Sequence, residues 1–147
     1  MNPIYAITRE ILSFFNLTDA GKVDSTISII LKGWKKGISD RQINIKTLNS
    51  IYESKLDDMN DNLADAQAQL NDAWLAINPE VVGSSRAEQK EFAVEFERNI
   101  DAHTAEVERL QKNIEEFVSE HKAKIGAVES EIKELEYKIS KLDPSNS

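Results

Sequence analysis

Residues 86–142 read RAEQKEFAVEFERNIDAHTAEVERLQKNIEEFVSEHKAKIGAVESEIKELEYKISKL, and this stretch decides the fold. No proline interrupts it. Its seam positions follow one another at steps of three and four residues, which is the spacing of coiled-coil heptads with a stutter. The seam positions are Ala93, Phe96, Ile100, His103, Val107, Leu110, Ile114, Phe117, His121, Ile125, Val128, Ile132, Leu135, Ile139 and Leu142. The spacing therefore predicts one long amphipathic helix.

A second heptad stretch, also with a stutter, precedes the first one in the chain. Its seam positions are Ile45, Leu48, Tyr52, Leu56, Met59, Leu63, Ala66, Leu70, Ala73 and Ile77. Ser39 and Gln42 have the spacing of a capping box, which marks the start of a helix. Pro79 cannot continue a helix. We therefore expect a helix over about residues 40–77 and a loop over 78–85.

Two heptad helices joined by a short loop predict an all-α protein, a long antiparallel helical hairpin with coiled-coil packing. Ser85 and Glu88 form a second capping box, so the last helix should start at about residue 86 and run to about 142. Pairing the two helices outward from the loop sets Ile77 near Arg86.

Residues 1–38 precede the hairpin, which we place at 39–143. Apolar residues at helical spacing predict two short helices there, a small base for the hairpin, and the second should end at Gly37. The seam beyond about residue 121 has no partner in the shorter hairpin helix. We expect the two short helices and a second subunit to cover it. Residues 144–147 should form a disordered tail.

The composition narrows the classes of protein that the chain can belong to. It has 26 acidic and 18 basic residues, a formal charge of −8, so it is no general binder of phosphate backbones or anionic membranes. It has no cysteine, which excludes disulfide frameworks and zinc–thiolate sites. We find no membrane-spanning stretch and no signal peptide, and we expect a cytoplasmic protein.

The residues that could carry chemistry do not form a recognisable catalytic, metal or cofactor site. A short acidic run resembles a calcium loop, but Leu63 stands at the position of the turn glycine and Gln69 at that of the bidentate glutamate. His103 and His121 fall on the seam, where they could act as a pH switch or simply fix the register. We expect no enzyme, no metal and no cofactor.

Charge is segregated along the chain. Residues 22–46 carry six bases against two acids, whereas residues 56–85 carry six acids and no base. This polarity and the long helices favour a non-catalytic interaction protein, a scaffold, an assembly chaperone or an inhibitor, that docks on another protein and forms a homo-oligomer. The candidate contact residues are Trp34, Trp74, Val81, Val82, Asp57, Asp61 and Asp65.

An alternative function follows from the basic segment at residues 22–46. The run Gly37-Ile38-Ser39-x-x-Gln42-Ile43 resembles the turn of a helix-turn-helix. The resemblance implies a DNA-binding regulator that dimerises through its coiled coil. Nucleic acid would be the partner only in this case, and the contacts would come from Lys35, Lys36, Arg41, Gln42 and Lys46.

Overall fold

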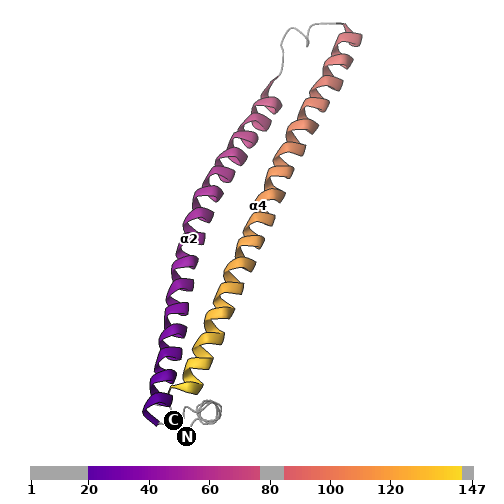
Figure 1. Ribbon diagram of the computed structural model, residues 1–147. Helices are drawn as coiled ribbons and strands as arrows, with labels where there is room; N and C mark the ends of the chain where they lie inside the picture. The colour runs from indigo at the N-terminus through magenta and orange to yellow at the C-terminus, as the bar shows by residue number, and fades with distance from the viewer. Residues whose placement is uncertain (1–19, 77–84, 144–147) are drawn as a thin grey trace. The chain divides into compact units, whose positions relative to one another are not determined.

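The computed structural model describes residues 20–76 and 85–143, and these residues form two long α-helices (Figure 1). Helix α2 spans Ala20–Leu75 and helix α4 spans Arg86–Leu142. Neither described range contains a strand. The described part of the chain is therefore an all-helical hairpin, as the heptad spacing predicts.

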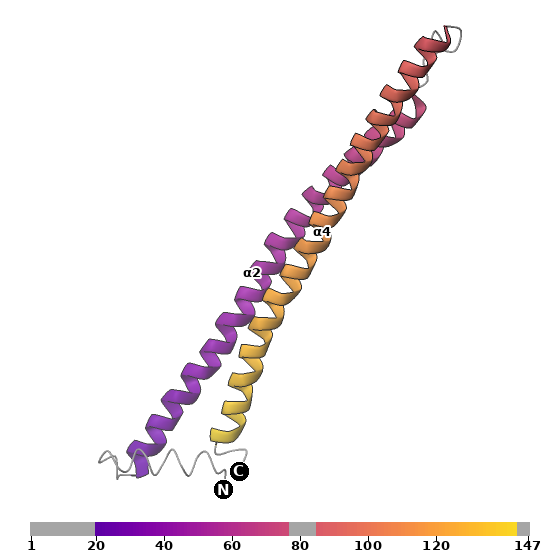
Figure 2. The ribbon, with the colours of Figure 1, turned by 90° about the vertical axis from the view of Figure 1, so that its right-hand side faces the viewer.

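The contacts between Cα atoms divide the chain into two units. Met1–Asn49 and Lys122–Ser147 form the first unit, and Ser50–His121 forms the second unit. Views from two directions show that a segment of α2 lies beside a segment of α4 in each unit (Figures 1 and 2). Each unit therefore has its own apolar interface between the two helices.

The first unit contains a core cluster of four buried apolar side chains. Three of them come from successive turns of α2, and one comes from the end of α4. They are Val23, Ile27, Leu31 and Leu142. Ile30, Trp34 and Ile139 pack against this core. The Arg41 guanidinium contacts Glu131 further along the same interface, so the two segments run antiparallel.

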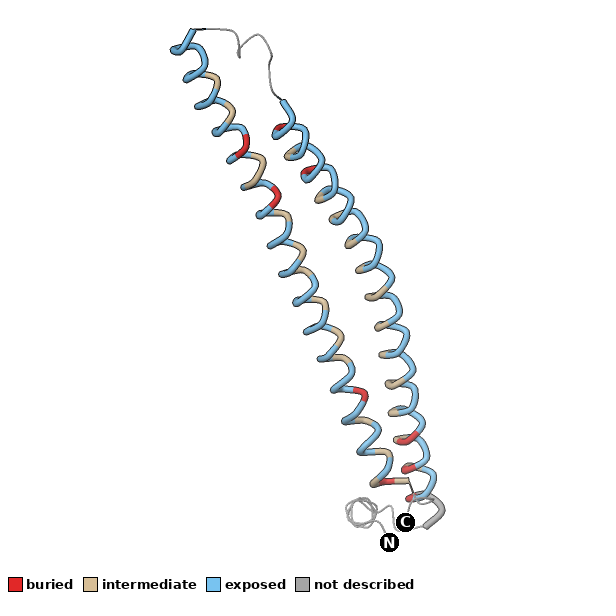
Figure 3. The backbone as a smooth tube through the Cα atoms, turned by 180° about the vertical axis from the view of Figure 1, so that it is seen from behind, coloured by how far each residue is buried: buried red, intermediate tan, exposed pale blue. Residues whose placement is uncertain are grey.

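The second unit is held by small and branched side chains on the facing sides of the two helices. Its buried residues are Ala66, Ala73, Ile100 and Val107. Tyr52 stacks on His121 at one end, and Trp74 packs edge-on against Phe96 at the other, so these segments also run antiparallel. Buried and half-buried residues lie on the facing sides, and exposed residues cover the rest (Figure 3).

The predicted seams agree closely with the observed burial. Each predicted seam position from Ile45 to Ala73 is buried or half-buried, and so is each one from Phe96 to Leu142. Ala93 is an exception, because it is exposed and Phe92 is half-buried in its place. The physical reason is the four-residue step, which brings the Phe92 ring onto the Phe96 ring at 5.9 Å.

The predicted helix break at Gly37 is wrong. Helix α2 runs without interruption through Gly37 and Ser39, so the capping box predicted at Ser39 lies inside the helix. The predicted second and third helices are therefore one helix, so the second helix of the predicted base is not a separate element. The first predicted helix lies within residues 1–19, and the predicted loop and tail lie almost wholly in 77–84 and 144–147, all outside the described residues.

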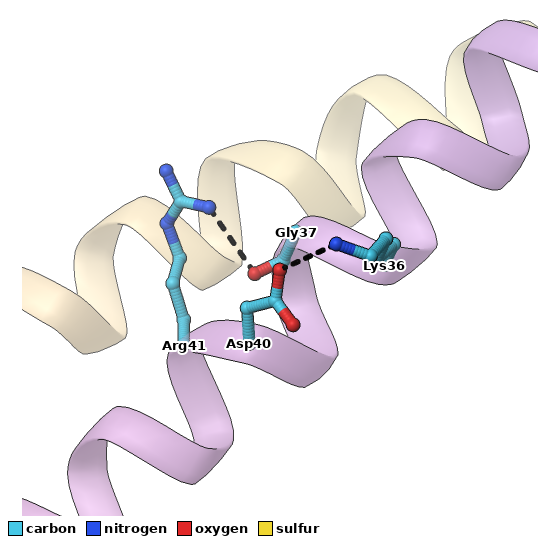
Figure 4. Close-up of polar contacts among 4 residues, drawn as sticks. All are labelled: Lys36, Gly37, Asp40 and Arg41. Carbon is cyan, nitrogen blue, oxygen red and sulfur yellow. Dashed lines mark hydrogen bonds and ion pairs between the residues drawn. The ribbon is translucent and has the colours of Figure 1, made fainter.

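Side-chain contacts stabilise helix α2 at Gly37. Arg41 Nη1 donates to the carbonyl oxygen of Gly37 at 3.1 Å, and the Lys36 ammonium pairs with Asp40 at 3.3 Å (Figure 4). Asp40 therefore forms an ion pair within helix α2 and does not act as a helix cap. Trp34, Ile38, Arg41 and Ile45 are half-buried at steps of four, three and four, so the seam continues across the position where we expect the break.

The seam at the end of α4 is covered by the same chain. Its partner in the first unit is the N-terminal part of α2, the segment that the sequence assigns to a separate short helix. The register also differs from the predicted one. Trp74 packs on Phe96, whereas pairing Ile77 with Arg86 would set Trp74 about one helical turn beyond Arg86. Packing of the side chains, and not the position of the loop, sets this register.

The start of α4 follows the predicted capping pattern. The Ser85 hydroxyl oxygen accepts a hydrogen bond from the backbone N–H of Glu88 at 3.3 Å, and the Ser85 carbonyl oxygen accepts one from the N–H of Gln89 at 3.0 Å. Neither described helix contains an apolar stretch that is long enough to cross a membrane.

Two glycines of α2 should respond differently to alanine. A Cβ at Gly33 would meet no atom within 4 Å, so Gly33→Ala should raise the free energy of unfolding by about 0.5–1 kcal/mol. A Cβ at Gly37 would lie 3.2 Å from Arg41 Nη1 and 3.4 Å from Leu135 Cδ1. Gly37→Ala should therefore be less stable than Gly33→Ala. Urea unfolding followed by circular dichroism measures both, and equal gains would contradict the packing at Gly37.

Ile132→Asp should destabilise the protein by about 3 kcal/mol, because it places a carboxylate in an apolar interface. Ile132 is 9% exposed on the seam of α4. Tyr137→Asp is the matched control on the same helix, because Tyr137 is 59% exposed, and it should change stability by less than about 1 kcal/mol. Thermal melts of the two variants measure the difference, and equal losses would show that the seam is not the stabilising face.

Candidate functional site

The last turn of α2 carries an aromatic residue that the hairpin leaves largely exposed. Trp74 is 56% exposed, although its ring packs edge-on against Phe96 with 5.9 Å between the ring centroids. The Phe92 ring stacks on the Phe96 ring, with 5.9 Å between the ring centroids. Trp74, Phe92 and Phe96 are termed the aromatic cluster. Next to it, Leu75 is 70% exposed.

The local sequence explains why the cluster forms. The seam position in this turn is Ala73, which is 6% exposed and has a small side chain. Trp74 follows it directly, so its ring lies on the flank of the interface and reaches Phe96 from the side. The contact with Phe96 fixes the indole ring, and the open flank leaves more than half of its surface in water.

Exposed acidic residues outnumber the basic ones in the unit that holds the aromatic cluster. Asp65 and Asp72 on α2, and Glu91, Glu95 and Glu97 on α4, are all exposed within the second unit. A partner that covers Trp74 would therefore meet a negative field, which favours a surface bordered by lysine or arginine.

Two surface depressions lie in the second unit. One follows the outer face of α4 and is lined by Ala87, Lys90, Glu91, Val94, Glu95 and Arg98. The other lies between the helices and is lined mainly by polar groups, among them Asn62, Asp65, Gln69, Glu106 and Arg109. Arg109 Nη2 contacts Glu106 at 2.6 Å, and this hydrogen bond holds the pKa of the Glu106 carboxyl below its ordinary value.

The structure separates the predicted partner-contact residues into different environments. Trp34 is half-buried and packs against the core of the first unit, so it is not an available anchor. Trp74 is the accessible tryptophan. Asp57, Asp61 and Asp65 are exposed on α2. Val81 and Val82 lie outside the described residues.

The predicted nucleic-acid contacts depend on a turn between two helices, and the structure has no such turn at residues 22–46. A helix-turn-helix needs two helices that cross at the turn, but residues 22–46 lie within the single helix α2. Arg41 also faces α4, because its Nε donates to Glu131 at 2.9 Å. The remaining predicted contacts, Lys35, Lys36, Gln42 and Lys46, are exposed. The resemblance to a helix-turn-helix is therefore wrong as a structure.

The two histidines lie half-buried on the seam of α4, as the sequence predicts. The His121 ring is nearly parallel to that of Tyr52, with 3.7 Å between the ring centroids. Phe117 stacks on the same Tyr52 ring at 5.2 Å, and the Lys55 ammonium lies 5.2 Å from the Phe117 centroid. This stack was missed from the sequence, because it needs the register between the helices. The pH-switch hypothesis for His103 and His121 stays a prediction.

The described residues contain no group of three or more histidine or acidic side chains placed to hold a metal ion. Comparisons of the chain with protein-family models, with curated proteins and with solved structures give no match.

The Tyr52–His121 stack should show a measurable coupling energy. In a double-mutant cycle, Tyr52→Ala and His121→Ala should couple by about 0.5–1.5 kcal/mol, the range for stacked aromatic pairs. Tyr52→Ala and Phe96→Ala are the control pair, because no ring contact joins these residues within the described part of the chain. Urea unfolding supplies the four free energies of each cycle. A coupling near zero for the first pair would contradict the stack.

Proposed function

We propose that this chain is a non-catalytic interaction protein that docks its helical surface on a protein partner through the aromatic cluster. The observation that carries the proposal is the exposure of Trp74, 56% of whose surface is open to solvent while Phe96 holds its ring in place. Tryptophan is enriched among the residues that dominate binding energy at interfaces. A ring that is already fixed loses little conformational entropy on binding.

The surroundings of Trp74 favour a particular kind of partner. Leu75 extends the apolar surface beyond the indole ring, and exposed carboxylates border it. An apolar groove with a basic rim would bury Trp74 and Leu75 and place its lysines and arginines opposite the carboxylates. A scaffold, an assembly chaperone and an inhibitor would all use such a surface.

The proposal includes finer features of the architecture. The steps of three and four residues along both seams support coiled-coil packing with stutters in the two helices. A two-helix interface buries little area per residue, which supports further cover by a second subunit.

Affinity capture from the native host, analysed by mass spectrometry, tests the docking site. The wild-type chain and Ile51→Ala should retain the same specific partner, and Trp74→Ala should lose at least about tenfold of it, the size of a typical hot-spot loss. Ile51→Ala is the matched control, because Ile51 is 61% exposed in the same unit. Circular dichroism checks that the three chains are equally helical.

Equal retention of the partner by Trp74→Ala and the wild-type chain would contradict docking through the aromatic cluster. Equal loss by Trp74→Ala and Ile51→Ala would show that binding depends on general surface hydrophobicity and not on this site.

The alternative function, DNA binding, rests on one remaining observation. Lys35, Lys36 and Lys46 are exposed on the α2 segment of the first unit. A DNA-binding chain should bind a random duplex in fluorescence anisotropy with a strong dependence on salt, and Lys35→Glu/Lys36→Glu should abolish that binding. No binding at low salt would exclude this alternative.

A further inference from the structure

The outer face of α2 in the first unit combines apolar and basic side chains. Ile29 is 70% exposed and Ile43 is 59% exposed. These isoleucines and three exposed lysines follow one another at steps of three, four, seven and three residues, which keeps them on one face of a helix, away from the seam. The set is termed the basic stripe and consists of Ile29, Lys32, Lys36, Ile43 and Lys46. Asp40 lies on the same face and pairs with Lys36 at 3.3 Å, so Lys32 and Lys46 are the lysines of the stripe that this aspartate does not engage.

The outer face of α2 in the second unit has the opposite character. Four exposed aspartates and Leu75, which is 70% exposed, follow at steps of four, four, seven and three. The set is termed the acidic stripe and consists of Asp57, Asp61, Asp65, Asp72 and Leu75. This α2 segment has no base from residue 56 onward, so no lysine or arginine on it offsets the aspartates.

The charges of the two units follow the same division. The first unit has 12 basic and 9 acidic residues, a formal charge of +3, whereas the second has 6 basic and 17 acidic residues, a charge of −11. A surface that complements the basic stripe is therefore present on every other copy of this chain. Any solution of the chain therefore contains this acidic surface at the same concentration as the basic stripe.

We propose that two copies of this chain associate by laying the basic stripe of one copy along the acidic stripe of the other. The spacings match in an antiparallel arrangement. Ile29 precedes Lys32 by three residues, and Leu75 follows Asp72 by three. When Lys32 lies opposite Asp72, Ile29 lies opposite Leu75. The Ile29 and Leu75 side chains are then removed from water together.

The same register sets Lys36 opposite Ala68 and Ile43 opposite Asp61, and it brings one further opposite-charge pair together. Lys46 lies fourteen residues after Lys32, and Asp58 lies fourteen residues before Asp72, so Lys46 arrives opposite Asp58 beside Asp57. Such exposed ion pairs are individually weak and screened by salt. The association is therefore salt-sensitive. The exposed apolar residues contribute binding free energy that salt does not screen.

This inference goes beyond the docking proposed for Trp74, since it names another occupant and does not use the aromatic cluster, although Leu75, Asp65 and Asp72 belong to both surfaces. Nucleic acid is the competing anion for the basic stripe. The second copy is favoured because the acidic stripe also carries Leu75 at the position that Ile29 requires, and a phosphate backbone offers no such apolar contact.

Sedimentation velocity of the full chain over a range of concentrations tests the proposal. The wild-type chain should associate at about 20 mM salt, and its dissociation constant should rise at least about tenfold at about 500 mM. Lys32→Glu/Lys36→Glu/Lys46→Glu should weaken self-association at least about tenfold, and so should Asp61→Lys/Asp65→Lys/Asp72→Lys. All six substituted side chains are exposed, and circular dichroism checks that both variants are helical.

Mixing the two variants is the decisive step. In each variant alone, two stripes of the same charge would face each other and repel. In the mixture, an acidic stripe can again pair with a basic one, so association should return to near the wild-type level. Lys122→Glu/Lys124→Glu/Lys133→Glu is the matched control for the lysine variant, because it makes the same change in net charge as that variant at exposed positions of α4. This control should associate like the wild-type chain.

Three results would overturn the proposal. They are a wild-type chain that is monomeric at both salt concentrations, a mixture of the two variants that remains dissociated, and a control variant that dissociates as readily as the stripe variants. The Trp74→Ala chain should self-associate normally, so a failure of this proposal and a failure of the docking site can be told apart.

Discussion

The structure depends on the burial of one apolar seam between two helices. Each helix of a pair can turn only one face to its partner, so the apolar positions must recur at steps of three and four residues to remain on that face. Val23, Ile27, Leu31 and Leu142 show the result in the first unit, where this interface excludes water almost completely. All other faces of both helices lie outside the interface, and exposed residues dominate them.

Polar residues on the seam must find partners inside it, because an unpaired polar group there would be costly. Arg41 does so with its guanidinium, which reaches Glu131 on α4 and the carbonyl oxygen of Gly37. The hydrogen bond needs the space that glycine leaves at residue 37. His121 finds its place by stacking on Tyr52. Polar side chains therefore occur on the seam where a specific neighbouring group forms a hydrogen bond or a stack with them.

The surface left outside the seam carries the two proposed activities. Trp74 lies beside the seam, where Phe96 supports it and water still reaches it. The basic and acidic stripes lie opposite the seam on α2, one in each unit. A helix pair with one buried face offers several separate faces for binding. Because Leu75, Asp65 and Asp72 belong to both surfaces, a protein partner at Trp74 and a second copy along the stripes would compete for these side chains, whereas Trp74 itself belongs to the docking site alone.

The sequence by itself determined the helical class, the seam positions from Ile45 to Ala73, and the capped start of α4 at Ser85, because each depends on local spacing or on contacts within a few residues. It could not reveal that α2 continues through Gly37. A glycine followed by a capping pattern ends an isolated helix, whereas here half-buried residues on both sides of Gly37 and the contact of Arg41 with α4 continue the interface. The register, the Tyr52–His121 stack and the exposure of Trp74 were likewise decided by the tertiary structure, since each depends on which turn of α4 meets which turn of α2.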